Sequence, residues 1–246
     1  MGKVRCRRNA AGELVVDFLP NHGGARRGAG RRPSRPLGTS ASERRRAGVA
    51  HRRRADVKEG LPIHITTRTV REVGLLRRRK LYRAIRRSLV LGCHKRGFRV
   101  CHFSVARDRL HLVVEADSNA ALHRGMTGLL VRMARRLNRA GARRGQVFPD
   151  RYHHRVLSTP RQVRSGLCYV LNQALGVGRG AVALDTAQAD PCSSAAYFDG
   201  WARGVRKSLP PPDEGPPPVA APRSWLLATG WRSLGLVAVG EAPAAI

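Results

Sequence analysis

Two adjacent segments with a two-residue alternation constrain the fold most. Residues 98–105 and 109–116 both have the pattern of a β-strand, and a polar turn, Ala106-Arg107-Asp108, separates them. This arrangement predicts a β-hairpin. In the second segment, one face is apolar (Leu110, Leu112, Val114, Ala116) and the other carries Arg109, His111, Val113 and Glu115. Because side chains alternate along a strand, the segment predicts a strand with a core face and a polar site on its other face.

A first strand and a first helix precede this hairpin. Apolar and polar residues alternate over 62–67, which predicts a strand. Residues 77–95 then carry apolar side chains at four-residue spacing among many arginines, as an amphipathic helix does. Gly97 is expected to end that helix.

A second helix, a last strand and a third helix follow. Ser118 or Asn119 is expected to cap a long helix, and residues 146–157 predict a last strand or ribbon. The hydroxyl and proline of Thr159-Pro160 predict the start of a third helix that runs to about Leu175. This order predicts an α+β fold, a ferredoxin-like βαββαβα sandwich with an antiparallel sheet and helices on one face.

The two ends of the chain predict extensions on a central domain at 61–175. Residues 1–60 are rich in arginine, glycine and proline and predict a basic, mostly disordered arm, in which only 14–19 has a strand-like pattern. Residues 176–246 predict a C-terminal extension with a proline-rich linker at 210–218. Its three tryptophans are expected to dock onto the core, because such large apolar groups are usually buried; they are Trp201, Trp225 and Trp231.

The charge of the chain predicts a polyanionic partner. The formal net charge is +31, and residues 61–175 alone hold 25 Lys and Arg against 5 Asp and Glu, whereas residues 176–246 hold 6 of each. Phosphate contacts release counterions and supply affinity that is independent of sequence, so nucleic acid is the expected ligand. An apolar run long enough to cross a membrane is absent from the sequence, and the five cysteines form no CxxC pair. A cytoplasmic, nucleoid-associated protein with reduced thiols is therefore expected.

The third predicted helix carries a candidate nucleophile. Tyr169 lies off the apolar arc of this helix, and Gln173, four residues later, lies on the same flank. A tyrosine with a polar neighbour is suited to attack a phosphate or to contact one, although a plain surface tyrosine has the same pattern. Tyr152 is a competing candidate, for which DNA contact or packing is the favoured role.

The order of several short stretches resembles the HUH single-tyrosine transposases, in particular the REP-associated tyrosine transposases of bacteria. The stretches are Pro62-Ile63-His64-Ile65-Thr66, Phe103-Ser104-Val105, residues 110–115 and 145–153, Tyr169-Val170-Leu171-Asn172 and residues 224–231. The resemblance implies binding of single-stranded or hairpin DNA. It also implies nicking and rejoining through a 5′-phosphotyrosine intermediate, with a divalent metal (Mg²⁺ or Mn²⁺) that polarises the phosphate. In this reading Tyr169 is the nucleophile, and His111 and Gln173 are metal ligands.

One position departs from the pattern of the family. Arg109 stands where the first histidine of the motif is expected, and a guanidinium has no lone pair for a metal. Either His64 on the neighbouring strand supplies the missing nitrogen, or Arg109 clamps the phosphate directly. Glu115 is a further candidate ligand or a partner that orients His111. Six residues are expected to contact DNA: Arg109, Arg132, Arg135, Arg136, Arg151 and Tyr152.

Two alternative functions stay open from the sequence. The departure at Arg109 favours a degenerate member of the same fold that binds DNA or structured RNA without cutting it. A basic RNA-binding protein with a ferredoxin-like sheet is the other, but it requires exposed aromatic residues on the strands, where only Phe98 and Phe103 are available. A homodimer is among the expected assemblies.

Overall fold

A computed structural model describes residues 4–8, 14–18, 56–172, 189–202 and 215–244. The chain divides into two units, residues 1–47 and 48–246. The described part of the first unit is an antiparallel pair of strands, β1 (Val4–Arg8) and β2 (Leu14–Phe18). The strand-like pattern at 14–19 thus corresponds to β2, while most of the predicted disordered arm lies outside the described residues.

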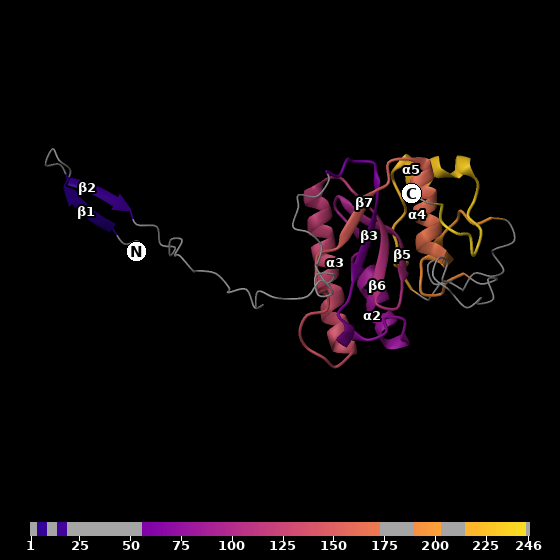
Figure 1. Ribbon diagram of the computed structural model, residues 1–246, viewed down its shortest axis with the longest axis horizontal. Coiled ribbons are helices and arrows are strands. Elements are labelled where there is room, and N and C mark those ends of the chain that lie inside the picture. Colours follow the sequence, from indigo (N-terminus) through magenta and orange to yellow (C-terminus); the bar gives the residue numbers. More distant parts are fainter. Residues whose placement is uncertain (1–3, 9–13, 19–55, 173–188, 203–214, 245–246) are drawn as a thin grey trace, which may run out of the picture. The chain divides into compact units, whose positions relative to one another are not determined.

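The second unit is built on an antiparallel sheet of five strands in the order β4-β5-β6-β3-β7 (Figure 1). The strands are β3 (Pro62–Arg68), β4 (His94–Lys95), β5 (Phe98–Val105), β6 (Arg109–Ala116) and β7 (His153–Val156). The predicted hairpin is confirmed with the expected bounds, because alternation and turn chemistry are both local signals. With the short β4 set aside, the order β5-β6-β3-β7 is that of a ferredoxin-like sheet, and the predicted fold class is confirmed.

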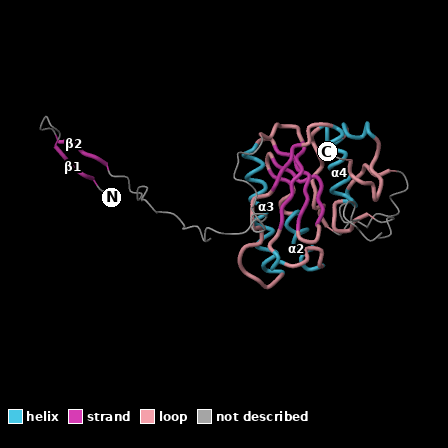
Figure 2. Tube along the Cα trace, in the orientation of Figure 1, coloured by secondary structure: helices cyan, strands magenta, loops and turns pink. Residues whose placement is uncertain are grey.

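Three helices cover the two faces of this sheet (Figures 1 and 2). Helices α2 (Arg79–Val90) and α3 (Asn119–Ala140) pack on the face that holds Ile63, Leu110 and Leu112. Helix α4 (Pro160–Asn172) packs on the other face, against Val113. The expectation that all helices lie on one face was therefore wrong. The reason is that the face of β6 predicted to be polar also carries Val113, and all of β6 except Arg109 is buried.

Helix α2 is shorter than its sequence pattern predicts. It ends at Val90 instead of about residue 95, and residues 94–95 form β4, which pairs with Phe98 and Arg99. Gly97 does not end the helix. It has a φ of +71° in the tight turn between β4 and β5, a backbone conformation that favours glycine. Pairing with β5 is a tertiary interaction, so the helical periodicity could not reveal it.

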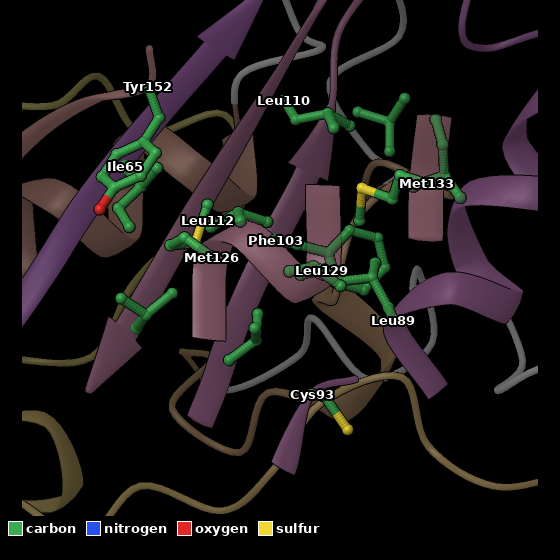
Figure 3. Close-up of a cluster of buried hydrophobic side chains, with 14 of the residues drawn as sticks. Ile65, Leu89, Cys93, Phe103, Leu110, Leu112, Met126, Leu129, Met133 and Tyr152 are labelled. Atoms are coloured by element: carbon green, nitrogen blue, oxygen red, sulfur yellow. The ribbon is translucent and has the colours of Figure 1, made fainter. Parts of the chain in front are cut away.

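The larger core lies between the sheet and helices α2 and α3 (Figure 3). Helix α3 contributes Leu122, Met126, Leu129, Met133 and Leu137 to this core. Ser118, one of the two residues expected to cap this helix, does so: its side chain accepts a hydrogen bond from the Ala121 N–H at 3.2 Å. The described helices include none that is long and apolar enough to cross a membrane.

Two glycines of α3 provide a matched test of this packing. A Cβ added to Gly125 would lie 2.2 Å from the ring of Phe98, whereas one added to Gly128 would meet no atom within 4 Å. Gly125→Ala is expected to lower the free energy of unfolding by about 1–3 kcal/mol through overpacking. Gly128→Ala is expected to raise it by roughly 0.5–1 kcal/mol through helix propensity. Urea denaturation of both variants measures the difference, and equal shifts would contradict the packing described here.

The described part of the C-terminal extension packs on the α4 face of the sheet. It contains the short helices η3 (Ala195–Tyr197), α5 (Trp225–Ala228) and η5 (Gly230–Leu234); a further short helix, η1 (Arg71–Val73), follows β3. Trp201 and Trp231 are buried in the smaller core with α4, as expected. Trp225 is 67% exposed, so the expected docking fails for this tryptophan. The residues of the proline-rich linker before 215 lie outside the described ranges.

Candidate active site

Three aromatic rings from three elements meet on the α4 face of the sheet. His64 comes from β3, His111 from β6 and Tyr169 from α4. The ring centroid of Tyr169 lies 5.1 Å from that of His111 and 5.4 Å from that of His64, in edge-on geometry, and the two imidazoles are 5.7 Å apart. The strand register explains the pairing: His64 is opposite Val113 and Thr66 is opposite His111, so the two histidines are diagonal neighbours on one face.

Both histidines are neutral at physiological pH. Burial, together with the charges of His153 and Arg155, lowers the pKa of His64 to about 4. Burial also lowers the pKa of His111 to about 3, with His64 and Arg109 acting in the same direction. A neutral imidazole keeps one ring nitrogen with a free lone pair. The pair can therefore act as a ligand or as a hydrogen-bond acceptor, but such low pKa values make both rings weak general bases.

A threonine on the adjacent strand orients one of the rings. The Oγ1 of Thr66 lies 3.2 Å from Nδ1 of His111. When Nδ1–H donates to this hydroxyl, Nε2 of His111 holds the lone pair. The Nε2 atoms of His64 and His111 are both buried without a hydrogen-bond partner among the described residues. Such orphaned groups are uncommon in folded proteins, and here both belong to the rings that contact Tyr169. The sequence pattern missed Thr66, because its role depends on the register between β3 and β6.

Arg109 lies at the start of β6, two residues before His111 on the same face. Its Nε is 3.1 Å from a carboxylate oxygen of Asp108, and its side chain is 43% exposed. Partial burial of Asp108 acts in the opposite direction, but the hydrogen bond from Arg109 and the charges of Arg109 and Arg68 lower the pKa of this carboxyl group. Arg109 is thus a cation held at the open edge of the site, where it can reach a phosphate.

The structure corrects the prediction for Glu115. This residue lies four positions beyond His111 on β6, roughly 13 Å away at the rise of a strand. Its carboxylate accepts hydrogen bonds from the backbone N–H groups of Arg223 and Ser224 at 2.8 and 2.9 Å and from the Ser224 hydroxyl at 2.7 Å. Arg99 lies at 3.7 Å. Glu115 therefore holds the C-terminal extension and neither ligates a metal nor orients His111.

The residues that were expected to contact DNA lie in different parts of the structure. Tyr152 is 5% exposed in the core beneath α2 and α3, which favours packing over DNA contact, the two roles expected for it (Figure 3). Arg132, Arg135 and Arg136 lie on α3, across the sheet from Tyr169. Arg151 is half-buried just before β7. Gln173 lies outside the described residues.

The described residues of the site supply some of the ligands that a divalent metal needs. Two neutral imidazoles with unpartnered Nε2 atoms supply two nitrogen donors of the type that Mn²⁺ and other divalent ions accept. Within the described ranges there is no group of three or more His, Cys, Asp and Glu side chains placed to hold an ion. His64 and His111 are the two candidate ligands. The predicted third ligand, Gln173, belongs to a segment that the structure does not describe.

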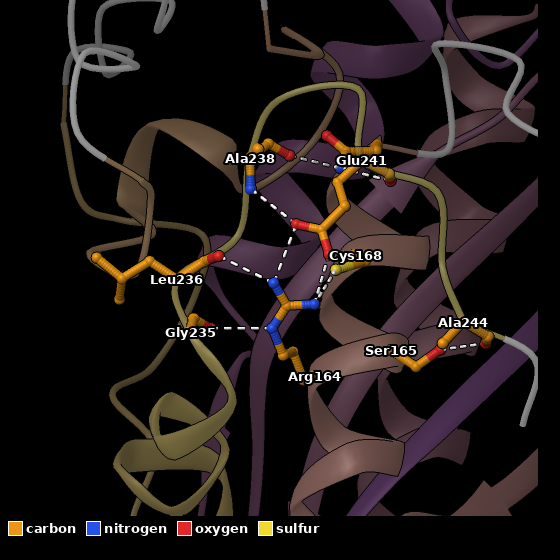
Figure 4. A network of polar contacts seen from close by, with 9 residues as sticks. Arg164, Ser165, Cys168, Gly235, Leu236, Ala238, Glu241 and Ala244 are labelled. Atoms are coloured by element: carbon orange, nitrogen blue, oxygen red, sulfur yellow. Dashed lines mark hydrogen bonds and ion pairs between the residues drawn. The ribbon is translucent and has the colours of Figure 1, made fainter.

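Polar contacts with the C-terminal segment hold α4, the helix that carries Tyr169 (Figure 4). Arg164 donates to the carbonyl oxygens of Gly235 and Leu236, both at 2.9 Å, and forms an ion pair with Glu241. At the other end of the helix, the Asn172 amide donates to the carbonyl oxygens of Ala238 and Glu241. Seven residues separate Arg164 from the end of the described helix, so the contacts bracket Tyr169. They fix the position of the tyrosine relative to the two histidines.

The buried histidines predict a specific pH dependence of stability. In an unfolded chain the pKa of each imidazole is near 6.5, whereas His64, His102 and His111 have folded values of about 4, 4 and 3. The stability they contribute is complete above pH 6.5 and is lost as the pH falls, because only the unfolded state takes up these protons. Between pH 7.5 and 5.5 the free energy of unfolding is expected to fall by about 1 kcal/mol for each histidine.

Urea denaturation at the two pH values measures this loss. His111→Asn should remove its own share of the pH dependence. His123→Asn, a change at an exposed position of α3, should leave the pH dependence intact. An equal decrease in the pH dependence of stability in both variants would contradict the assignment of His111 as a buried neutral group.

Two solved structures are similar to parts of this chain. A REP-associated tyrosine transposase solved with a REP hairpin aligns with a TM-score of 0.48 and 14% identity, over 66% of this chain and 89% of that chain. A transposase candidate from Deinococcus radiodurans aligns with a TM-score of 0.35 and 18% identity, over 44% of this chain and 87% of that chain. No protein-family model and no curated protein matches the sequence. A functional assignment therefore depends on the residues of the site itself.

Proposed function

We propose that this protein is a transposase-like enzyme that binds single-stranded or hairpin DNA and nicks and rejoins it through Tyr169. One observation carries the proposal: the Tyr169 ring lies against two neutral histidines whose buried Nε2 atoms have no hydrogen-bond partner among the described residues. A tyrosine, a pair of nitrogen ligands and a nearby arginine are suited to the transfer of a phosphodiester to the tyrosine hydroxyl. The excess of basic residues in this part of the chain supplies affinity for the DNA backbone.

The chemical step is a transesterification. The hydroxyl oxygen of Tyr169 forms a bond to phosphorus, and the bond between phosphorus and the 3′ oxygen breaks. The tyrosine loses one proton and the departing 3′ oxygen gains one, so the protein holds a 5′-phosphotyrosine and the DNA ends in a free 3′-hydroxyl. Attack by that hydroxyl, or by another 3′-hydroxyl, on the phosphotyrosine reverses the step and joins the strand. No external energy source is needed.

The residues around Tyr169 have distinct roles in this proposal. Arg109 binds a non-bridging phosphate oxygen and offsets the charge that develops on it. Thr66 holds the tautomer of His111 in which Nε2 faces the site. A divalent ion bound by His64 and His111 would polarise the phosphate as a Lewis acid. The helix contacts of Arg164 and Asn172 keep the tyrosine in reach of the same point.

A second candidate function is binding without cleavage, and Arg109 favours it. A permanent positive charge beside His111 opposes the binding of a cation, and the same charge strengthens the binding of a phosphate. The alternative is a protein of the same fold that holds DNA or structured RNA without forming a covalent intermediate.

A single assay separates the two functions. Purified protein is incubated with a labelled single-stranded DNA that contains a hairpin, with Mn²⁺ or Mg²⁺, and the products are separated on a denaturing gel. The proposal predicts a labelled band that migrates with the protein and that does not form when EDTA is present during the incubation. Tight, salt-sensitive binding with no covalent band under any of these conditions would establish the second candidate.

The substitution Arg109→His tests the role of this position in metal affinity. A third imidazole in place of the guanidinium adds a donor and removes a repulsive charge, so affinity for Mn²⁺ is expected to increase by about 10-fold or more. Isothermal titration with Mn²⁺ in the absence of DNA measures this directly. Arg107→His, at an exposed position in the neighbouring turn, is the control. Equal affinities in the two variants would show that residue 109 does not face the ligand pair.

A further inference from the structure

One positively charged surface of the domain has no role in the proposed chemistry. Helices α2 and α3 pack side by side on the face of the sheet opposite Tyr169, and a groove of about 520 Å³ lies between them. Arginine, lysine and alanine are the only residue types in its lining, which consists of Arg79, Lys80, Arg83, Ala84, Arg87, Arg136, Arg139 and Ala140. An acidic side chain is absent from this lining.

The basic side chains form two rows that follow the helix axes. Arg79, Arg83 and Arg87 recur every four residues, so they share one flank of α2. At a rise of 1.5 Å per residue they extend over about 12 Å. Arg136 and Arg139, three residues apart, form the facing row on α3. A groove bordered by two rows of guanidinium groups matches an extended anion with repeated charges better than a single small anion.

Among the described residues, these cations have no partner of opposite charge. The six basic residues of the groove form no ion pair and no side-chain hydrogen bond with any described residue. Neighbouring arginines behave differently: Arg77 pairs with Asp190 at 2.7 Å, and Arg86 donates to the Tyr197 hydroxyl at 3.3 Å. The chain thus uses some arginines of this region for its own structure and leaves those of the groove unpaired. Mutual repulsion of the unpaired set is relieved when an anion binds.

The composition of the lining selects the form of nucleic acid. Proteins that bind single strands stack the bases on aromatic side chains, and the lining contains no aromatic residue. A double helix presents only its phosphates to such a surface, because its bases are already stacked and paired. We infer that the groove between α2 and α3 binds the sugar-phosphate backbone of a double-helical nucleic acid, and that it is a binding surface separate from the site of Tyr169.

This inference extends the proposed function and rests on it in one respect, namely that both faces serve the same ligand. A folded nucleic acid with a helical stem and a single-stranded flank would place the stem in the groove and the flank at Tyr169. The five strands of the sheet lie between the two surfaces. The groove itself does not depend on the chemistry at Tyr169, so the two proposals can fail independently.

Two double variants in a Tyr169→Phe background test the groove. Arg83→Gln with Arg87→Gln removes two charges from the groove. Arg71→Gln with Arg96→Gln removes two charges from exposed positions outside it and is the control. Fluorescence anisotropy then gives the Kd of each protein for a short blunt-ended duplex DNA, for the duplex RNA of the same sequence and for a single-stranded DNA, at several salt concentrations.

The groove variant is expected to bind the duplex on the order of 10-fold more weakly at low salt. The slope of log Kd against log salt should fall by about 2, since each lost phosphate contact lowers it by roughly 0.9. The control should change Kd by less than about 2-fold. The tighter of the two duplexes identifies the type of helix. Equal losses in both variants, or complete displacement of the duplex by the single strand, would overturn the inference. A covalent adduct on a short single strand reports on Tyr169 whatever the duplex result.

Discussion

Replacing Tyr169 by phenylalanine is expected to abolish the covalent adduct with single-stranded DNA, a loss on the order of 10³-fold or more. Phenylalanine keeps the ring that contacts His64 and His111 and removes only the hydroxyl group. DNA affinity and the free energy of unfolding should therefore stay within about 2-fold and about 1 kcal/mol of the original protein. Adduct yield on a denaturing gel and anisotropy with the same oligonucleotide measure the two properties side by side.

The matched control for this variant is Tyr82→Phe. Tyr82 lies on α2, across the sheet from the site, and its hydroxyl donates to the Pro191 carbonyl oxygen at 3.1 Å. Loss of this hydrogen bond should affect stability slightly and should leave the adduct in place. An adduct that persists in Tyr169→Phe, or disappears in Tyr82→Phe, would contradict the assignment of the nucleophile.

Replacing Glu115 by alanine is expected to lower the free energy of unfolding by about 3–5 kcal/mol. The carboxylate is 7% exposed and accepts three hydrogen bonds from Arg223 and Ser224. Its removal also leaves Arg99, itself 7% exposed, as a buried charge without its partner. The loss should extend to the packing of the C-terminal segment, because Ser224 caps α5 through the bond from Leu227 N–H.

Urea denaturation compares this variant with Asp108→Ala. Asp108 also forms ion pairs with arginines, but its side chain is 38% exposed and its partners Arg68 and Arg109 are 68% and 43% exposed. Exposed pairs contribute little, so this control should lose no more than about 1 kcal/mol. A loss in Glu115→Ala as small as that of the control would mean that the C-terminal segment is not held through this carboxylate.

The parts of the fold that sequence could predict depend on local patterns. The bounds of β5 and β6 followed from alternation around a polar turn, and Ser118 was one of the two residues expected to cap α3. The end of α2 could not be predicted, because residues 94–95 leave the helix to pair with β5. The position of α4 could not be predicted either. Periodicity shows which side of a helix is buried, but it does not show which face of a sheet the helix packs against.

The candidate site, too, could be predicted from the sequence only in part. Tyr169 was visible in the sequence as a tyrosine off the apolar arc of its helix, and His64 as a histidine on the neighbouring strand. Their contact with His111, and the hydrogen bond from Thr66, depend on the register between β3 and β6, which a single sequence does not give. Glu115 was assigned to the site because it shares a face with His111. The residues that donate hydrogen bonds to its carboxylate lie more than 100 positions later in the chain.

Identification of the residue that carries the DNA tests whether Tyr169 is the nucleophile. The protein is incubated with a single-stranded oligonucleotide and Mn²⁺, digested with nuclease and protease, and sequenced by tandem mass spectrometry. One modified peptide is expected, with a nucleoside phosphate linked to the hydroxyl oxygen of Tyr169. A modified Tyr152, or a fully recovered unmodified Tyr169 peptide under conditions that cleave the DNA, would contradict it.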